Sequence, residues 1–117
     1  MADVTIFHNP ACSKSRGALA ILEERGVGAE VVRYLDTPPD RPTLERMLDA
    51  IGGDPAALVR TGDARFGEAG FTKADVATRD GVLAVLLAEP RLMERPVLLV
   101  GARGVIGRPP ERVLDLL

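Results

Sequence analysis

The segment HNPACSKSR, residues 8–16, holds the only cysteine and the only histidine of the chain, together with positive charges and no negative ones. Cys12 lies between a β-branched run, Val4–Phe7, and a segment with helical spacing. A helix N-terminus offers free amide groups and partial positive charge, which bind oxyanions and lower the pKa of a thiol. The pattern therefore indicates a thiolate at Cys12, an oxyanion bound beside it, or both.

The charges around this helix start support that interpretation. Helix N-termini favour acidic side chains, yet the first turn here carries Lys14 and Arg16, and His8 lies just upstream. Ser15 can add a hydroxyl hydrogen bond to a thiolate or cap the first amides. The plain alternative is that Cys12 is a small buried hydrophobic residue, as free cysteines commonly are.

The spacing argues against other cysteine chemistries. Cysteine-dependent phosphatases place an arginine six positions after the nucleophile, where this chain has Ala18. A dithiol redox motif needs a second cysteine, and Ser15 occupies that position. One cysteine and one histidine also argue against a metal site. Redox chemistry at Cys12 would therefore pass through a mixed disulfide with a thiol from outside the chain.

The composition is that of a globular protein, since 46% of the 117 residues are hydrophobic and 27% are charged. A formal net charge of -2 argues against nucleic-acid binding. The sequence shows no apolar run long enough for a membrane span and no N-terminal targeting signal. A lone cysteine allows no internal disulfide, which fits a reducing cytoplasm. We expect a cytoplasmic protein that acts without a nucleic-acid or membrane partner.

Hydrophobic periodicity predicts how Cys12 is positioned. Strands at Val4–Phe7 and Glu30–Leu35 flank a helix from Ser13 to Arg25, and this order suggests a parallel βαβ unit. A hairpin formed by 97–100 and 105–106 and a helix over 110–116 close the chain.

The segment between these two halves is predicted to be helical. Its predicted parts are helices over 44–51, 55–60 and 79–88 and an exposed glycine-rich loop at 61–70. The prediction is one α/β domain, residues 1–117, with a mixed sheet and a helical insertion at about 42–90.

An acidic chain needs convergent cations if it is to hold an anion. Three arginines lie in predicted loops or at the ends of predicted elements: Arg60, Arg95 and Arg108. Each guanidinium can donate two hydrogen bonds to one oxyanion.

Several short strings then resemble the glutaredoxin-dependent arsenate reductases. They are HNPACSKSR, YLDTPP at 34–39, LVR at 58–60, ERPVLLV at 94–100 and IGRPPE at 106–111. Each string is short, but their order and separations over nearly the whole chain make the resemblance specific. It implies a thioredoxin-like fold with a helical insertion, and a cis peptide bond at Pro96 beside the active thiol.

The resemblance also implies roles for individual residues. Cys12 would attack arsenate, and the oxyanion and its covalent adduct would be held by Arg60, Arg95 and Arg108. His8 and Ser15 would tune the thiolate, and Asn9 would shape the loop. No bound cofactor is implied. Glutathione would act as a co-substrate that attacks the adduct, and glutaredoxin would resolve the mixed disulfide.

Two other functions remain open from the sequence. One is a thiol-disulfide oxidoreductase acting on glutathionylated substrates, which needs Cys12 but tolerates loss of Arg60 and Arg95. The other is a non-enzymatic adaptor of the same fold that binds a protein such as RNA polymerase, because a fold alone does not fix a function.

Overall fold

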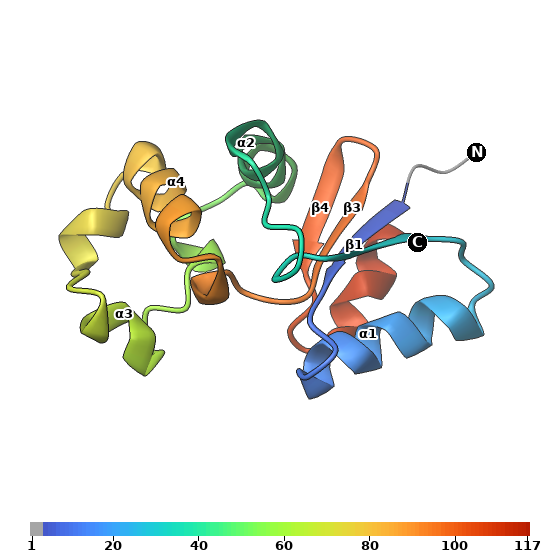
Figure 1. The fold of residues 1–117 in the computed structure, drawn as a ribbon. Helices are drawn as coiled ribbons and strands as arrows, with labels where there is room; N and C mark the ends of the chain where they lie inside the picture. The colour runs from blue at the N-terminus through green and yellow to red at the C-terminus, as the bar shows by residue number, and fades with distance from the viewer. Residues whose placement is uncertain (1–3) are drawn as a thin grey trace.

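A four-stranded mixed sheet forms the centre of the computed structural model, which describes residues 4–117 (Figure 1). The first three residues, where we expected no targeting signal, lie outside the described part. The spatial order of the strands is β2-β1-β3-β4. Their bounds are Val4–His8 for β1, Glu30–Arg33 for β2, Val97–Val100 for β3 and Arg103–Ile106 for β4.

Strand directions follow from the connections. Helix α1, Ser13–Glu24, joins β1 to β2, and these two strands are parallel as the βαβ pattern predicts. β3 runs antiparallel to β1 and pairs with β4 as a hairpin. The carboxyl end of β1 therefore lies beside the start of β3, with Phe7 opposite Val97.

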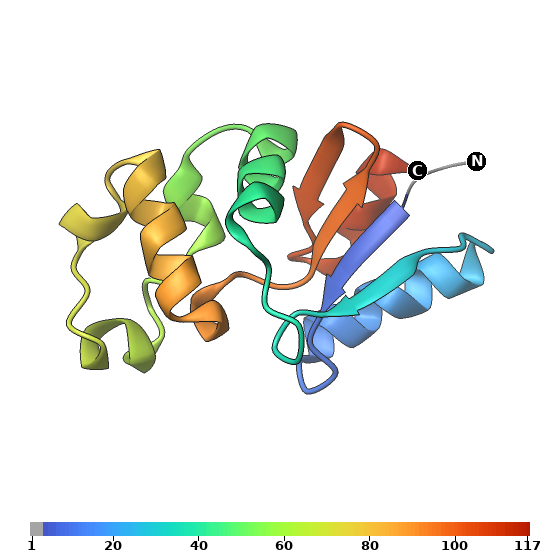
Figure 2. The ribbon, with the colours of Figure 1, turned by 45° about the horizontal axis from the view of Figure 1, so that its top comes forward.

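Alternation of side chains along the strands divides the core into two clusters. Val4, Ile6 and Leu98 pack on one face against α1 and the C-terminal 3₁₀ helix η4, Pro110–Leu116. Phe7 and Leu99 belong to a second cluster on the other face, which the helical insertion completes. Figure 2 shows α1 and α2 on opposite sides of the sheet. The fold is the predicted thioredoxin-like α/β arrangement.

The elements between β2 and β3 are all helical in the described chain. They are α2 Arg41–Ile51, η1 Pro55–Leu58, α3 Ala64–Glu68, η2 Lys73–Val76, α4 Arg79–Ala88 and η3 Pro90–Leu92. Side-chain oxygens cap several of their first turns, as Asp40 does for α2 by accepting from the amide of Thr43 at 3.0 Å. None of the helices in residues 4–117 is long and apolar enough to cross a membrane.

The prediction of an exposed loop at 61–70 is wrong. Ala64–Glu68 forms α3, because the Asp63 carboxylate caps its first turn and Phe66 is buried, with 6% of its surface exposed. A helix of one turn leaves too short a hydrophobic pattern to be found by periodicity, and the glycines around it resemble those of a loop.

Element ends also differ from the prediction around the insertion. The helix expected to reach Arg60 ends at Leu58, because Val59 is extended and pairs with Met93. The strand expected to reach Leu35 ends at Arg33, whose carbonyl accepts hydrogen bonds from two later amides in a turn. The second hairpin strand begins at 103 rather than 105. The short helices η2 and η3 were not predicted.

Candidate active site

The loop between β1 and α1 is closed by hydrogen bonds of Asn9. The carbonyl oxygen of Asn9 accepts from the amide of Cys12 at 3.0 Å, and its side-chain oxygen accepts from the amide of Ala11 at 3.0 Å. Arg16 donates to the carbonyl of Pro10 at 2.8 Å and holds the loop from the helix side. These bonds place Cys12 at the N-cap of α1, where it is partly exposed.

Ser15 connects this loop to the end of β1. Its hydroxyl is fully buried, lies 2.8 Å from Nδ1 of His8, and accepts from the amide of Asn9 at 2.9 Å. The hydroxyl is thus engaged with His8 and Asn9, whereas the backbone amide of Ser15 acts on the Cys12 sulfur. Any tuning of the thiol by the Ser15 side chain is indirect, through the shape of the loop.

The surroundings of Cys12 favour a thiolate. Burial raises the pKa of Cys12, but hydrogen bonds from the Ser15 amide, the Arg95 side chain and the Lys14 amide outweigh it and lower the pKa to about 7. Both amides belong to the first turn of α1, so the helix N-terminus contributes as the sequence predicts. Part of the protein then carries the nucleophilic thiolate at neutral pH.

His8 does not act on the sulfur as a cation. Burial, followed by the charges of Arg33 and Arg16, lowers the pKa of His8 below its usual value, although the backbone at Ser15 works in the opposite direction. A neutral imidazole at neutral pH follows. His8 is hydrogen-bonded to the Ser15 hydroxyl, which in turn accepts from the amide of Asn9 in the loop that carries Cys12.

Two of the three predicted arginines face the thiol. Nη1 of Arg108 lies 3.9 Å from the Cys12 sulfur and also donates to the carbonyl oxygen of Arg95 at 3.0 Å. The Arg95 guanidinium helps to lower the pKa of Cys12, while its Nη1 donates to the carbonyl oxygen of Arg91 at 3.5 Å. The Arg95–Pro96 peptide bond is cis, as expected, and the shared donor from Arg108 places it next to the thiol. The Arg108–Pro109 bond is also cis, which we did not predict.

The third predicted arginine, Arg60, is paired with carboxylates instead of with the Cys12 sulfur. It pairs with Asp63 at 3.5 Å and with Glu94 at 3.3 Å, and it is not among the groups that lower the pKa of Cys12. The other carboxylate oxygen of Glu94 lies 3.6 Å from Nε of Arg108. Glu94 therefore joins two of the candidate anion-binding arginines before any anion is present.

Sequence reasoning did not select Glu94, although it lies in the string ERPVLLV. Nothing in the sequence around Glu94 indicates that its carboxylate pairs with both Arg60 and Arg108. The pairing depends on the bridge between Val59 and Met93, which brings the two chain segments together.

Tyr34 is a second residue that the sequence did not single out as part of the site. It follows β2, is fully buried, and belongs to the core cluster that joins the sheet to the insertion. Burial raises the pKa of Tyr34, while the charge of Arg95 and the Asn9 side chain lower it. The phenol oxygen of Tyr34 nevertheless has no hydrogen-bond partner in the described chain, so no hydrogen bond joins it to Asn9. Nε of Arg95 is likewise buried without a partner.

The donor set around Cys12 consists of guanidinium and amide N–H groups, which bind anions and repel metal ions. Within residues 4–117 no three histidine, cysteine, aspartate or glutamate side chains gather as they would around a metal. The arrangement can hold a small oxyanion beside a nucleophilic sulfur.

Comparison with known proteins agrees with this arrangement. The model of the ArsC family matches residues 7–116. A protein of Neisseria meningitidis described as an arsenate reductase is 41% identical over the whole length of both chains. An arsenate reductase of Escherichia coli strain K12 is 33% identical over the whole of this chain and 82% of its own.

Solved structures give the same result. The structure described as an arsenate reductase from Vibrio cholerae superposes with a TM-score of 0.89 at 35% identity, covering 99% of this chain and 98% of that one. A structure described as a putative arsenate reductase from Yersinia pestis gives a TM-score of 0.86 at 41% identity, with coverage of 97% and 99%.

Proposed function

Because this chain belongs to the ArsC family, we propose that it reduces arsenate to arsenite through Cys12, with glutathione and glutaredoxin as reductants. The observation that carries the proposal is the Cys12 thiol at the N-terminus of α1 with Nη1 of Arg108 3.9 Å from its sulfur, a setting in which the two amides of the first turn and Arg95 lower the pKa of Cys12. A nucleophile and an anion-binding group are thus side by side, as an attack on an oxyanion requires.

In the first step the Cys12 thiolate attacks the arsenic of arsenate. A sulfur–arsenic bond forms, one arsenate oxygen leaves as water after taking up protons, and arsenic remains pentavalent. Arg108 and Arg95 hold the oxyanion and compensate the negative charge that builds up on it. Arg60 binds the same anion once arsenate displaces Glu94 from its ion pair with Arg60.

In the second step the sulfur of glutathione attacks the Cys12 sulfur of the adduct. A disulfide bond forms and the sulfur–arsenic bond breaks, with its electron pair passing to arsenic. Arsenic is reduced from the pentavalent to the trivalent state, and arsenite leaves with the thiol proton. The two sulfurs together supply the two electrons, so the lone cysteine of this chain suffices.

In the third step a glutaredoxin thiol attacks the mixed disulfide between Cys12 and glutathione. The Cys12 thiolate is regenerated and the glutathionyl group passes to glutaredoxin. The cycle needs a reducing thiol pool, which fits action in the cytoplasm.

The test is arsenite formation by the purified protein with arsenate, glutathione and glutaredoxin. We expect turnover by the wild type and none by Cys12→Ser. Phosphate in place of arsenate is the control, because thiols do not reduce pentavalent phosphorus and glutathione oxidation should then stop. Absence of arsenite from a folded protein with a reduced thiol contradicts the proposal.

Substitution of Arg60 separates this function from that of a thiol-disulfide oxidoreductase. Arg60→Ala should raise the KM for arsenate, because one anion-binding guanidinium is lost. It should leave reduction of a small glutathionylated disulfide unchanged, since that reaction holds no oxyanion.

A further inference from the structure

Tyr34 has a hydroxyl that is buried without a hydrogen-bond partner among residues 4–117. The residue has 0% of its surface exposed. Buried polar groups in native proteins are nearly always hydrogen-bonded, and a catalytic role is one of the reasons for an exception. The reaction steps proposed at Cys12 leave this hydroxyl without a role.

The backbone places Tyr34 beside the loop that carries Cys12. Strands β1 and β2 are parallel, with His8 opposite Arg33, so the residues that follow, Asn9 and Tyr34, are neighbours at the carboxyl ends of the two strands. The Asn9 side chain accordingly acts on the phenol. The phenol therefore belongs to the end of the sheet at which the thiol lies.

The core around the phenol joins it to two segments that carry arginines. Tyr34 shares a buried cluster with Val59 and Met93, which pair with each other as an isolated bridge. Arg60 directly follows the first bridge residue, and Arg95 comes two positions after the second. Two of the arginines expected to hold the oxyanion thus extend from the cluster that contains the phenol.

Electrostatic effects on the phenol agree with this position. Burial has the largest effect and raises the pKa of Tyr34, the charges of Arg95 and Arg60 lower it, and the charge of Cys12 raises it. The net effect is a raised pKa, so the phenol keeps its proton at neutral pH and can donate a hydrogen bond.

Arg95 supplies a second buried donor in the same region. Its Nη1 donates to the carbonyl oxygen of Arg91, and its own carbonyl oxygen accepts from Arg108, but its Nε has no partner. Within residues 4–117, this Nε and the Tyr34 hydroxyl are the only buried side-chain nitrogen or oxygen atoms without a hydrogen bond. Because an N–H group donates and does not accept, the two donors together fit an oxygen that carries no proton.

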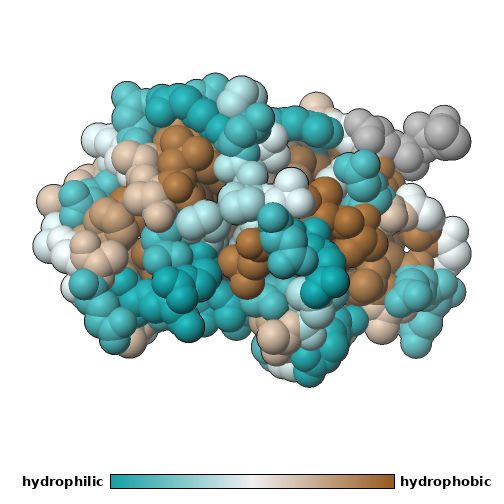
Figure 3. All heavy atoms as spheres, in the orientation of Figure 1, coloured by the Kyte–Doolittle hydropathy of each residue, from teal (hydrophilic) through white to brown (hydrophobic). Residues whose placement is uncertain are grey.

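A cavity of about 220 Å³ gives access to this region from solvent. Its walls include Asn9, Arg95 and Leu35, the residue after Tyr34. Helix α3 adds Arg65 to the wall, and the surface over α3 is mostly hydrophilic in the space-filling view (Figure 3). A small anion can therefore approach Arg95 over a polar surface.

We propose that the Tyr34 hydroxyl is a ligand of the substrate: it donates a hydrogen bond to one oxygen of the oxyanion bound at Cys12, beside the Nε–H of Arg95. The inference rests on the proposed function, in which this oxyanion is arsenate and then its adduct with the Cys12 sulfur. No bond of the reaction forms or breaks at Tyr34, which keeps its proton throughout. The hydrogen bond strengthens as negative charge builds up on the oxygen.

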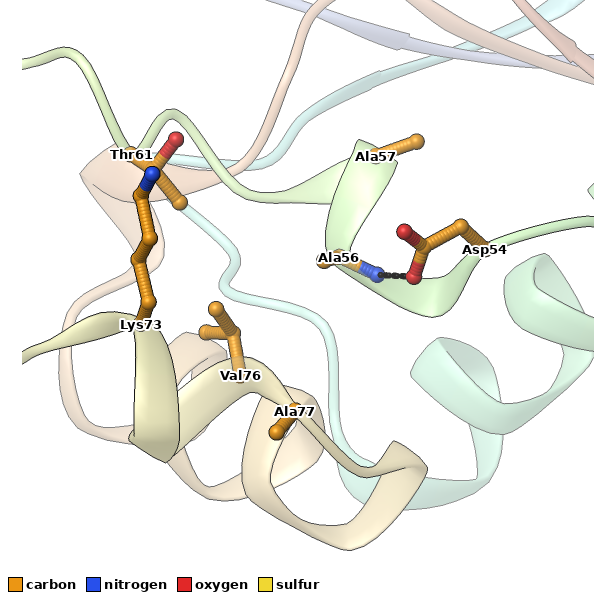
Figure 4. Close-up of a pocket in the computed structure, with 7 residues that line it drawn as sticks. All are labelled: Asp54, Ala56, Ala57, Thr61, Lys73, Val76 and Ala77. Carbon is orange, nitrogen blue, oxygen red and sulfur yellow. Dashed lines mark hydrogen bonds between the residues drawn. The ribbon is translucent and has the colours of Figure 1, made fainter.

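A hollow of about 450 Å³ between η1 and η2 does not offer such donors (Figure 4). Asp54 and Lys73 lie on opposite sides of it, and the Asp54 carboxylate already accepts from the amide of Ala56 at 3.0 Å. None of its lining residues has a buried polar side-chain atom without a partner. The carboxylate also repels an anion, so we do not expect an oxyanion there.

The first test measures oxyanion binding without reduction. Inorganic phosphate bound beside Cys12 should slow alkylation of the thiol by iodoacetamide, and the concentration that gives half protection reports its affinity. We expect Tyr34→Phe to raise this concentration about tenfold, because a hydrogen bond to a charged group is lost. Without phosphate, alkylation should keep its dependence on pH, since Tyr34 is not among the groups that lower the pKa of Cys12.

The matched control is Thr5→Val, which also removes one hydroxyl. Thr5 has 8% of its surface exposed and lies with Phe7 on the same face of the sheet, toward the end of β1 that is far from the thiol. The control should protect like the wild type. An equal half-protecting concentration in Tyr34→Phe and Thr5→Val, or no protection of the wild type by phosphate, overturns the proposal.

The second test uses steady-state kinetics of arsenite formation. Tyr34→Phe should lower kcat/KM for arsenate about tenfold. It should leave reduction of a small glutathionylated disulfide unchanged, since that reaction holds no oxyanion. An equal loss in both reactions shows that Tyr34 supports the thiol instead of the anion, and this overturns the proposal.

The two tests separate this inference from the proposed function. Failure of the wild type to form arsenite, with weakened phosphate protection in Tyr34→Phe, contradicts arsenate reduction alone. Normal arsenite formation, with unchanged protection and kinetics in Tyr34→Phe, contradicts the role of Tyr34 alone.

Discussion

At the scale of single residues, the central property is the charge of the Cys12 sulfur. The pKa of about 7 lies below the ordinary thiol value of 9.0, because hydrogen bonds from two amides and Arg95 outweigh burial. The reactive thiolate is the form above the pKa, so alkylation by iodoacetamide should rise with pH to half its maximum near pH 7. Arg95→Met should shift this profile to higher pH.

The control for this experiment is Arg103→Met. Arg103 pairs with Val100 at the opposite end of β3 from the thiol and donates to the carbonyl of Asp115. Its removal should leave the alkylation profile in place. A wild-type half-maximum near pH 9 shows that the thiol is not activated.

Glu94 sets how many of the site's positive charges are free for substrate. Its carboxylate lies 3.3 Å from Arg60 and 3.6 Å from Arg108. Glu94 therefore competes with arsenate for these two arginines and also repels its negative charge. Glu94→Gln removes the charge and keeps the shape. It should lower the KM for arsenate several-fold, by about 1 kcal/mol of weaker repulsion. Glu45→Gln, on the exposed side of α2, is the control; a higher KM in Glu94→Gln means that Glu94 positions the arginines instead.

Tyr34 carries a buried hydroxyl without a partner in the described chain. Burying an unpaired hydroxyl costs free energy, so Tyr34→Phe should raise the free energy of unfolding by about 1 kcal/mol. The measurement is urea denaturation followed by circular dichroism. A loss of stability instead reveals a hydrogen bond from the hydroxyl, for which Asn9 is the nearest candidate by its effect on the pKa of Tyr34.

At the scale of elements, the end of β1 and the start of α1 are held together by one side chain. The Ser15 hydroxyl is bonded to both His8 and the amide of Asn9 inside the protein. Ser15→Ala leaves both groups buried without a partner, and this should lower the free energy of unfolding by about 2 kcal/mol. Ser13→Ala, an exposed position in the same turn, should change it by less than about 0.5 kcal/mol. Equal stability of the two variants contradicts the coupling.

The same elements show what the sequence could reveal. The strand, loop and helix around Cys12 were predicted because the spacing of apolar residues changes there from that of a strand to that of a helix, and because Asn9–Pro10 marks the turn between them. The helix α3 was missed because a single turn has almost no periodicity. Its stability comes from burial of Phe66 and from capping by Asp63, which are tertiary and side-chain effects.

The convergence of charges was only partly predictable. Arg95 and Arg108 were selected by their places next to prolines, and the structure brings both to the thiol. The pairing of Arg60 with Glu94 could not be inferred, because it depends on backbone contacts between 59–60 and 92–93.

At the scale of the whole molecule, the sheet and the insertion share one core. Phe7 from β1 and Leu99 from β3 belong to the same buried cluster as residues of α2, α4 and η3. Tyr34 lies in this cluster and is the only tyrosine, and the chain has no tryptophan. Its fluorescence therefore reports the contact between sheet and insertion.

We expect the insertion and the sheet to unfold in one transition, because separation would expose a face of the shared core on both parts. Urea denaturation followed by tyrosine fluorescence and by far-ultraviolet circular dichroism should give the same midpoint and the same slope. A fluorescence midpoint well below that of circular dichroism shows that the insertion detaches first. In that case the core shared by the sheet and the insertion would open before the sheet unfolds, while the N-terminus of α1 would remain beside Cys12.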